Sequence, residues 1–106
     1  MIKVDYEFRN GVMFVRFLGM VINYRYKETI DNVIYIIRKI GIKMVVFNLD
    51  NIKAIDAFVI DYLLKCNNLI KEDDGKMFIC SSNCFKWKFW HRIPVIGSET
   101  EALNVI

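Results

Sequence analysis

Hydrophobic residues change their spacing along the 106-residue chain, and each change predicts an element of secondary structure. Residues Lys3 to Arg9 and Val12 to Leu18 are rich in β-branched and aromatic side chains, which favours two strands. Asn10-Gly11 stands between them and is the strongest short-range signal for a β-hairpin, because both residues tolerate positive φ. We expect Gly19 to close the second strand. The first predicted unit is therefore a hairpin.

Helical spacing begins at Asn23 and again near Asp56. Asn23 is expected to cap the first helix and Gly41 to end it. The apolar face of this helix is predicted at Tyr26, Ile30, Val33, Ile34, Ile37 and Ile40. The second helix is expected to exit at Asp73-Asp74-Gly75. Its face is predicted at Val59, Ile60, Leu63, Leu64, Asn67 and Ile70.

Short apolar runs alternate with these helices. Lys43 to Leu49 and Lys76 to Cys80 are typical of strands buried on both faces, and Val95-Ile96 predicts a short last strand. Residues Asn83 to Ile93 predict a third helix, and Ser98 to Val105 a terminal one. Strands that alternate with helices favour parallel crossovers. We therefore expect an α/β fold with about four helices and a single mixed sheet, built from the N-terminal hairpin plus parallel strands, in one domain spanning residues 1–106.

Composition narrows the class of protein. Hydrophobic residues make up 55% of the chain and charged residues 25%, which excludes a disordered chain. No apolar run approaches the ~18 residues of a membrane-spanning helix, and no signal peptide is visible, so we expect a cytoplasmic protein without membrane insertion. The net charge of +3 is too small for an electrostatic nucleic-acid binder.

Residues that carry chemistry are sparse. His91 is the sole histidine and has no nucleophile or carboxylate partner nearby in sequence. The cysteines Cys66, Cys80 and Cys84 lack zinc-site spacing and are interpreted as free thiols of a reducing compartment. There is no Gly-rich phosphate loop and no nucleophile elbow. We expect no catalytic residue, no metal site and no cofactor.

Three stretches resemble the STAS family, which includes anti-anti-sigma factors, stressosome scaffold proteins and the cytoplasmic tails of anion transporters. They are Val12 to Gly19, Val45 to Val59 (VVFNLDNIKAIDAFV) and Ile93 to Leu103 (IPVIGSETEAL). The resemblance implies a non-enzymatic interaction domain of a bacterial regulatory pathway, similar to an anti-sigma factor antagonist. Its protein partner would be an anti-sigma factor kinase or another STAS protein.

The same stretches depart from the family pattern. Asp56 falls on the family's motif aspartate, but Ala57 stands where the phosphorylatable serine belongs. Phe58 replaces the second serine and Val59 the glycine, so the resemblance implies no phosphorylation at the usual site. Two further departures are Asn48 in place of an aspartate and Met20 where an acidic residue is frequent. The plainer alternative is that Asp56-Ala57 is only a helix start.

The resemblance and the expected topology place one partner-binding surface at the carboxyl ends of the strands. It comprises the loop from Met20 to Asn23, the loop from Asp50 through Asn51 to Ile55, and the helix start from Asp56 to Val59. Phe58 is either an exposed anchor or packed on the sheet. Two other functions stay open: sensing of a small ligand, a nucleotide or lipid, near these loops, and a structural homodimer or scaffold built on the third helix.

The segment from Cys84 to Arg92 alternates aromatic and basic residues. One interpretation is a helix with Phe85, Phe89 and Ile93 inward and its cations solvated. A second is a protein contact through Trp87 or Trp90. A third is stacking on nucleic acid or lying on a lipid surface. The sequence alone leaves the three open.

Overall fold

The computed structural model describes residues 3–22, 26–82 and 92–104, and for residues 20–22 the backbone alone. Five strands form one sheet in chain order: β1 (Lys3–Arg9), β2 (Val12–Ile22), β3 (Met44–Ile55), β4 (Lys76–Cys80) and β5 (Val95–Ile96). β1 is antiparallel to β2, and every later neighbour is parallel. The expected mixed α/β sheet with an N-terminal hairpin is confirmed.

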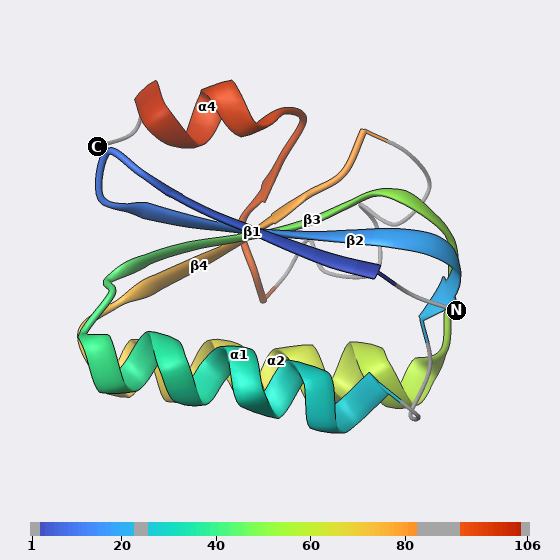
Figure 1. Ribbon diagram of the computed structural model, residues 1–106, viewed down its shortest axis with the longest axis horizontal. Helices are drawn as coiled ribbons and strands as arrows, with labels where there is room; N and C mark the ends of the chain where they lie inside the picture. The colour runs from blue at the N-terminus through green and yellow to red at the C-terminus, as the bar shows by residue number, and fades with distance from the viewer. Residues whose placement is uncertain (1–2, 23–25, 83–91, 105–106) are drawn as a thin grey trace.

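The helices lie on both faces of this sheet. Figure 1 shows α1 (Lys27–Ile40) and α2 (Ala57–Glu72) side by side on one face and α4 (Glu99–Asn104) on the other. Among the described residues these are the three α-helices. The predicted helix over Asn83 to Ile93 falls almost entirely outside the described residues; Ile93 itself is buried.

Strand alternation divides the core into two clusters. On the α1–α2 face, Phe17 and Phe47 meet edge to face with ring centroids 5.8 Å apart, among buried aliphatic residues of both helices. On the α4 face a smaller cluster joins Phe14 and Phe78 to Ala102 of α4. Both faces of β2 and β3 are therefore covered, which explains their near-continuous apolar runs.

The helix ends follow the sequence signals in part. Gly41 ends α1 in the left-handed conformation, with φ 83°, as predicted. Asn23 does not cap this helix, because the N-cap is Tyr26 and α1 begins at Lys27. Ile40 was placed on the buried face wrongly: it is 67% exposed and lies one turn after the exposed Ile36, on a flank of the helix.

β2 and β3 are both longer than predicted. Gly19 does not close β2; it pairs with Ile52, and the pairing continues to Ile22 opposite Ile55. The expected loop from Asp50 to Ile55 is therefore strand, because parallel pairing with the end of β2 satisfies its backbone groups. A register shift between Arg16 and Leu18 adds one residue to β3 there, which is the mark of a β-bulge.

Candidate functional site

The start of α2 is built around Asp56. This residue is the N-cap, in extended conformation, and its Oδ1 accepts a hydrogen bond from the Val59 backbone N at 3.0 Å. The Asp56 carbonyl also accepts from Ile60 N at 3.2 Å. A carboxylate at this point satisfies an otherwise unpaired N–H group and lies at the positive end of the helix dipole. The Asp56 cap therefore stabilises the first turn of α2.

The first turn presents two side chains outward and one inward. Ala57 is exposed, and Phe58 is 51% exposed, so Phe58 is not packed into the sheet. Val59 was included in the expected surface, and that assignment is wrong because its side chain is only 2% exposed. Val59 supports the turn from below, within the core shared by α1, α2 and the sheet.

The ends of β2 and β3 lie beside the start of α2. Ile22 ends β2 directly opposite Ile55, and Asp56 follows Ile55. Asn51 is exposed on β3. Met20 lies in β2 with its side chain outside the described atoms, and Asn23 lies outside the described residues altogether.

Asp50 has a structural task that the sequence did not indicate. Its Oδ1 accepts hydrogen bonds from Ser82 N at 2.7 Å and Ser82 Oγ at 3.1 Å. Its own backbone N donates to Asn48 Oδ1 at 2.9 Å. Asp50 thus joins β3 to the segment after β4, and its carboxylate is already engaged within the chain.

A cluster of charges on the α4 face was missed by the sequence analysis. Arg16 Nε and Nη2 donate to the two carboxylate oxygens of Glu99 at 2.8 and 2.7 Å. Arg16 also bonds Asp5 at 3.1 Å and Glu7 at 2.6 Å. Asn48 Nδ2 donates to Glu99 at 2.7 Å. These contacts hold the pKa of Glu99 below its usual value, the Arg16 hydrogen bond being the largest cause.

The sequence did carry one signal for this cluster. In β2, Val12, Phe14 and Arg16 alternate onto one face, and the first two are completely buried. A cation at the third position of a buried stripe needs an anionic partner, because an unpaired buried charge is costly. The identity of that partner, Glu99 at a separation of 83 residues, could not be read from spacing.

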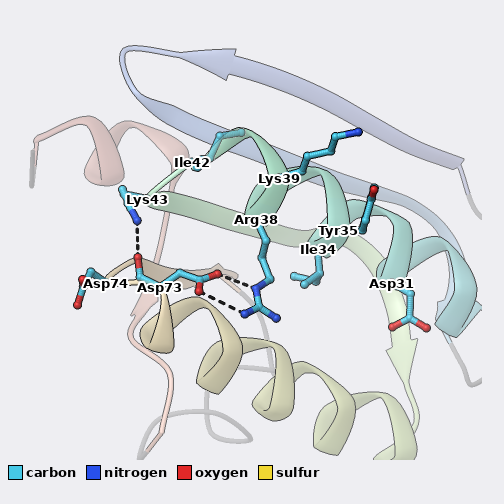
Figure 2. Close-up of a pocket in the computed structure, with 10 residues that line it drawn as sticks. Asp31, Ile34, Tyr35, Arg38, Lys39, Ile42, Lys43, Asp73 and Asp74 are labelled. Carbon is cyan, nitrogen blue, oxygen red and sulfur yellow. Dashed lines mark hydrogen bonds and ion pairs between the residues drawn. The ribbon is translucent and has the colours of Figure 1, made fainter.

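A groove of about 790 Å³ is lined by residues of α1, by Gly41 to Lys43 and by Asp73 and Asp74 (Figure 2). Asp73 and Asp74 follow α2 at the end away from its cap, Asp56. Arg38 crosses it to Asp73, with Nε–Oδ2 at 2.6 Å and Nη2–Oδ1 at 3.2 Å. Lys43 donates to the Asp73 carbonyl oxygen. None of the three described cavities is lined by residues 50–59. The predicted ligand pocket beside those residues is therefore not among them.

Cys66 and Cys80 are free and buried, and burial raises the pKa of each to about 12. Cys84 lies outside the described residues. In the described part of the chain, no group of three His, Cys, Asp or Glu side chains is placed to hold a metal ion. No helix among these residues is long and apolar enough to span a membrane.

Neither a protein-family model nor a curated protein matches this sequence. Solved structures do match. An anti-sigma factor antagonist from Mycobacterium paratuberculosis has a TM-score of 0.84 at 13% identity, over 100% of this chain and 94% of that one. The anti-sigma factor antagonist SpoIIAA in its unphosphorylated form has a TM-score of 0.78 at 14% identity, over 99% and 96%. The chain has the SpoIIAA fold.

A second SpoIIAA structure shows a different state of that protein. The Bacillus cell fate determinant SpoIIAA in its phosphorylated form has a TM-score of 0.69 at 13% identity, over 99% of this chain and 98% of that one. SpoIIAA has thus been solved both with and without phosphate. At these identities the likeness shows a common fold. It does not show that this chain and SpoIIAA share a binding site.

Proposed function

We propose that this chain is a non-enzymatic interaction domain that binds a regulatory protein through the start of α2. The observation that carries the proposal is the outward placement of Ala57 and Phe58 on a capped first turn. A half-exposed aromatic ring beside a small side chain can enter a pocket of a partner. The SpoIIAA-like fold supports the choice of partner class: an anti-sigma factor of the kinase type, or a second protein of this fold.

The proposed surface is smaller than the sequence suggested. It consists of Ala57 and Phe58 at the start of α2, together with Asn51, which is exposed on β3. We name these three residues the α2-start surface. Val59 is excluded by burial and Asp50 by its bonds to Ser82. No enclosed cavity is required, since the mechanism is the pairing of complementary surfaces without chemistry.

The alanine at position 57 bears on whether phosphorylation can regulate this surface. A serine here would hold a phosphate beside the first helical turn, at the positive end of the helix dipole. Phosphate adds roughly −1.5 to −2 charge and would disrupt a packed contact. The methyl group of Ala57 accepts no phosphate, so we infer a surface that stays permanently in its binding form.

The test begins with affinity capture from the native cell and continues with the purified partner. Ala57→Glu should abolish binding, because burying an unpaired carboxylate costs several kcal/mol. A micromolar association amounts to about 8 kcal/mol and cannot absorb that loss. The matched control is Asn68→Glu, an exposed position on the same helix, roughly 16 Å along its axis. Equal affinity of Ala57→Glu and wild type would show that the proposed site is wrong.

Two further variants separate structure from function. Asp56→Ala removes the cap and should lower the free energy of unfolding by ~1 kcal/mol whatever the protein binds. Ala57→Ser restores a hydroxyl at the family position. With an anti-sigma kinase partner and ATP, Ala57→Ser should gain a phosphate that the wild type does not, as read by intact-mass spectrometry. Phosphate on wild-type chain would contradict the inferred regulation.

A further inference from the structure

β1 leaves an unusual edge on the sheet. The opposite edge strand, β5, has two residues, whereas β1 has seven, and no proline interrupts it. Within the described residues, β2 is the one strand that pairs with β1. A long edge strand with unpaired N–H and C=O groups is a template for another strand, and proteins usually blunt it.

One face of β1 is apolar and exposed. Tyr6 pairs with Val15 and Phe8 with Met13, so both rings lie on the α1–α2 face of the sheet. The two rings are nevertheless 49% and 58% exposed, because α1 does not extend far enough across the sheet to cover β1. Figure 2 shows the hairpin on the flank of α1 opposite α2.

The helix beside this face continues the apolar surface. Ile36 and Ile40 of α1 are 45% and 67% exposed. Arg38 marks the side of α1 that faces α2, because it bonds Asp73. Each isoleucine is two residues from Arg38, so its side chain points about 160° away from that side. They therefore lie on the flank of α1 nearer β1. We name Tyr6, Phe8, Ile36 and Ile40 the β1 patch.

The carboxylates on the other face of β1 already have cationic partners within the chain. Arg16 of β2 holds Asp5 at 3.1 Å and Glu7 at 2.6 Å, and Arg9 lies 3.7 Å from Glu7. Charged side chains on an edge strand normally repel a second strand. Here Arg16 of the neighbouring strand binds both carboxylates and offsets part of their charge, so that barrier is weakened.

We propose that two copies of this chain associate through β1, antiparallel about a twofold axis at Glu7, joining their sheets edge to edge. In this register Asp5 faces Arg9 of the second copy, and Tyr6 faces Phe8. Opposite charges and aromatic rings directly across an antiparallel pair are both stabilising. Glu7 meets its own copy on the axis, each carboxylate bound by its own Arg16.

The neighbouring registers are worse. With the axis at Tyr6, Lys3 would face Arg9 and Asp5 would face Glu7, which places like charges opposite each other twice. With the axis at Phe8, Glu7 would face Arg9, but Tyr6 would face Asn10 of the turn, and its ring would have no aromatic counterpart. The axis at Glu7 is thus selected by charge and by burial of both rings.

The size of the contact predicts a weak dimer. Half-exposed aromatic rings leave roughly 100 Å² each to be covered. Even with the isoleucines and the strand backbone, the buried area falls near the low end for specific interfaces. The association should therefore depend on concentration. It leaves the α2-start surface uncovered on both copies, so it is independent of the function proposed above.

Sedimentation equilibrium of the full chain tests the contact. Wild type should shift from monomer to dimer as its concentration rises toward roughly 0.5 mM, where micromolar contacts are saturated. Phe8→Lys should raise the dissociation constant at least tenfold. Tyr35→Lys should leave it unchanged, since Tyr35 is 63% exposed on α1 but outside the β1 patch. A wild-type chain that stays monomeric, or equal weakening by both variants, would overturn the proposal.

A cross-link tests the register. Under mild oxidation Glu7→Cys should form a disulfide-linked dimer, because residue 7 faces itself across the axis. Asp61→Cys, exposed on α2, is the control, and wild type gives the baseline for the native cysteines. Cross-linking through Asp5→Cys but not through Glu7→Cys would reject this register. Far-ultraviolet circular dichroism confirms that each variant is folded.

Discussion

Arg16 and Glu99 are 83 positions apart and form a bidentate ion pair, with nitrogen–oxygen distances of 2.8 and 2.7 Å. The pair attaches α4 to the centre of β2. We expect Glu99→Ala to lower the free energy of unfolding by about 2 kcal/mol, because it leaves a largely covered guanidinium short of a partner. Urea unfolding measures the change. Glu101→Ala, exposed on the same helix, should stay within about 0.5 kcal/mol of wild type.

Acid should weaken the fold through the same carboxylate. The hydrogen bond from Arg16 lowers the pKa of Glu99, and that from Arg38 lowers the pKa of Asp73. Both carboxyls bind protons more tightly in the unfolded chain. Their stabilisation is therefore complete above the unfolded pKa, near 4, and is lost as the pH falls through the folded values. Urea unfolding between about pH 6 and pH 3 should show this loss, and Glu99→Gln should flatten it. An identical pH profile in that variant would contradict the assignment.

The buried thiols should resist alkylation. With the pKa of Cys66 and Cys80 raised to about 12 by burial, roughly one molecule in ten thousand carries either thiolate at pH 8. Iodoacetamide should leave both unmodified in the folded chain and modify both in concentrated urea. Peptide mass spectrometry assigns the sites. Labelling of Cys66 at the same rate with and without urea would disprove its burial.

Gly75 should tolerate no side chain. A Cβ there would lie 2.8 Å from Ile70 Cγ2 and 2.9 Å from the Lys43 carbonyl oxygen. Gly75→Ala should therefore cost ~1–3 kcal/mol of stability, as overpacking does. Gly41→Ala is the comparison, because a Cβ at Gly41 meets nothing within 4 Å and only its positive φ opposes the change. Thermal melts should place Gly75→Ala below Gly41→Ala, and the reverse order would refute the clash.

Local signals predicted most of the fold. Asn10 and Gly11 have φ of 52° and 82°, as the hairpin signal required. The Asp56 cap and the Gly41 end are equally local and were placed correctly. The extension of β3 was missed because the polar positions Asp50, Asn51 and Lys53 resemble a loop. Their strand conformation depends on β2, more than thirty residues earlier in the chain.

The candidate site was less predictable than the fold. A motif resemblance indicated Ala57 and Phe58, but helical phase alone did not decide whether Phe58 pointed outward. Val59 was misassigned because a surface was inferred from consecutive residues, whereas successive residues of a helix point in directions about 100° apart. The bonds of Asp50 to Ser82 and of Arg16 to Glu99 depend on tertiary contacts, which no local pattern encodes.

The order of the strands in the sheet matches their order in the chain, and this bears on how the protein is made. Each new strand can join the free side of the preceding one as it leaves the ribosome, so no completed pair has to reopen. The β2–β3 and β3–β4 pairings must nevertheless each close a crossover of about twenty residues that contains a helix, which is slower than closing the β1–β2 hairpin. α4 is the exception, because Arg16 must wait for Glu99. In a nascent chain without residue 99, Arg16 could bond Asp5 and Glu7, but its Nε would lack the Glu99 acceptor that it has in the folded chain, and docking of α4 would supply it.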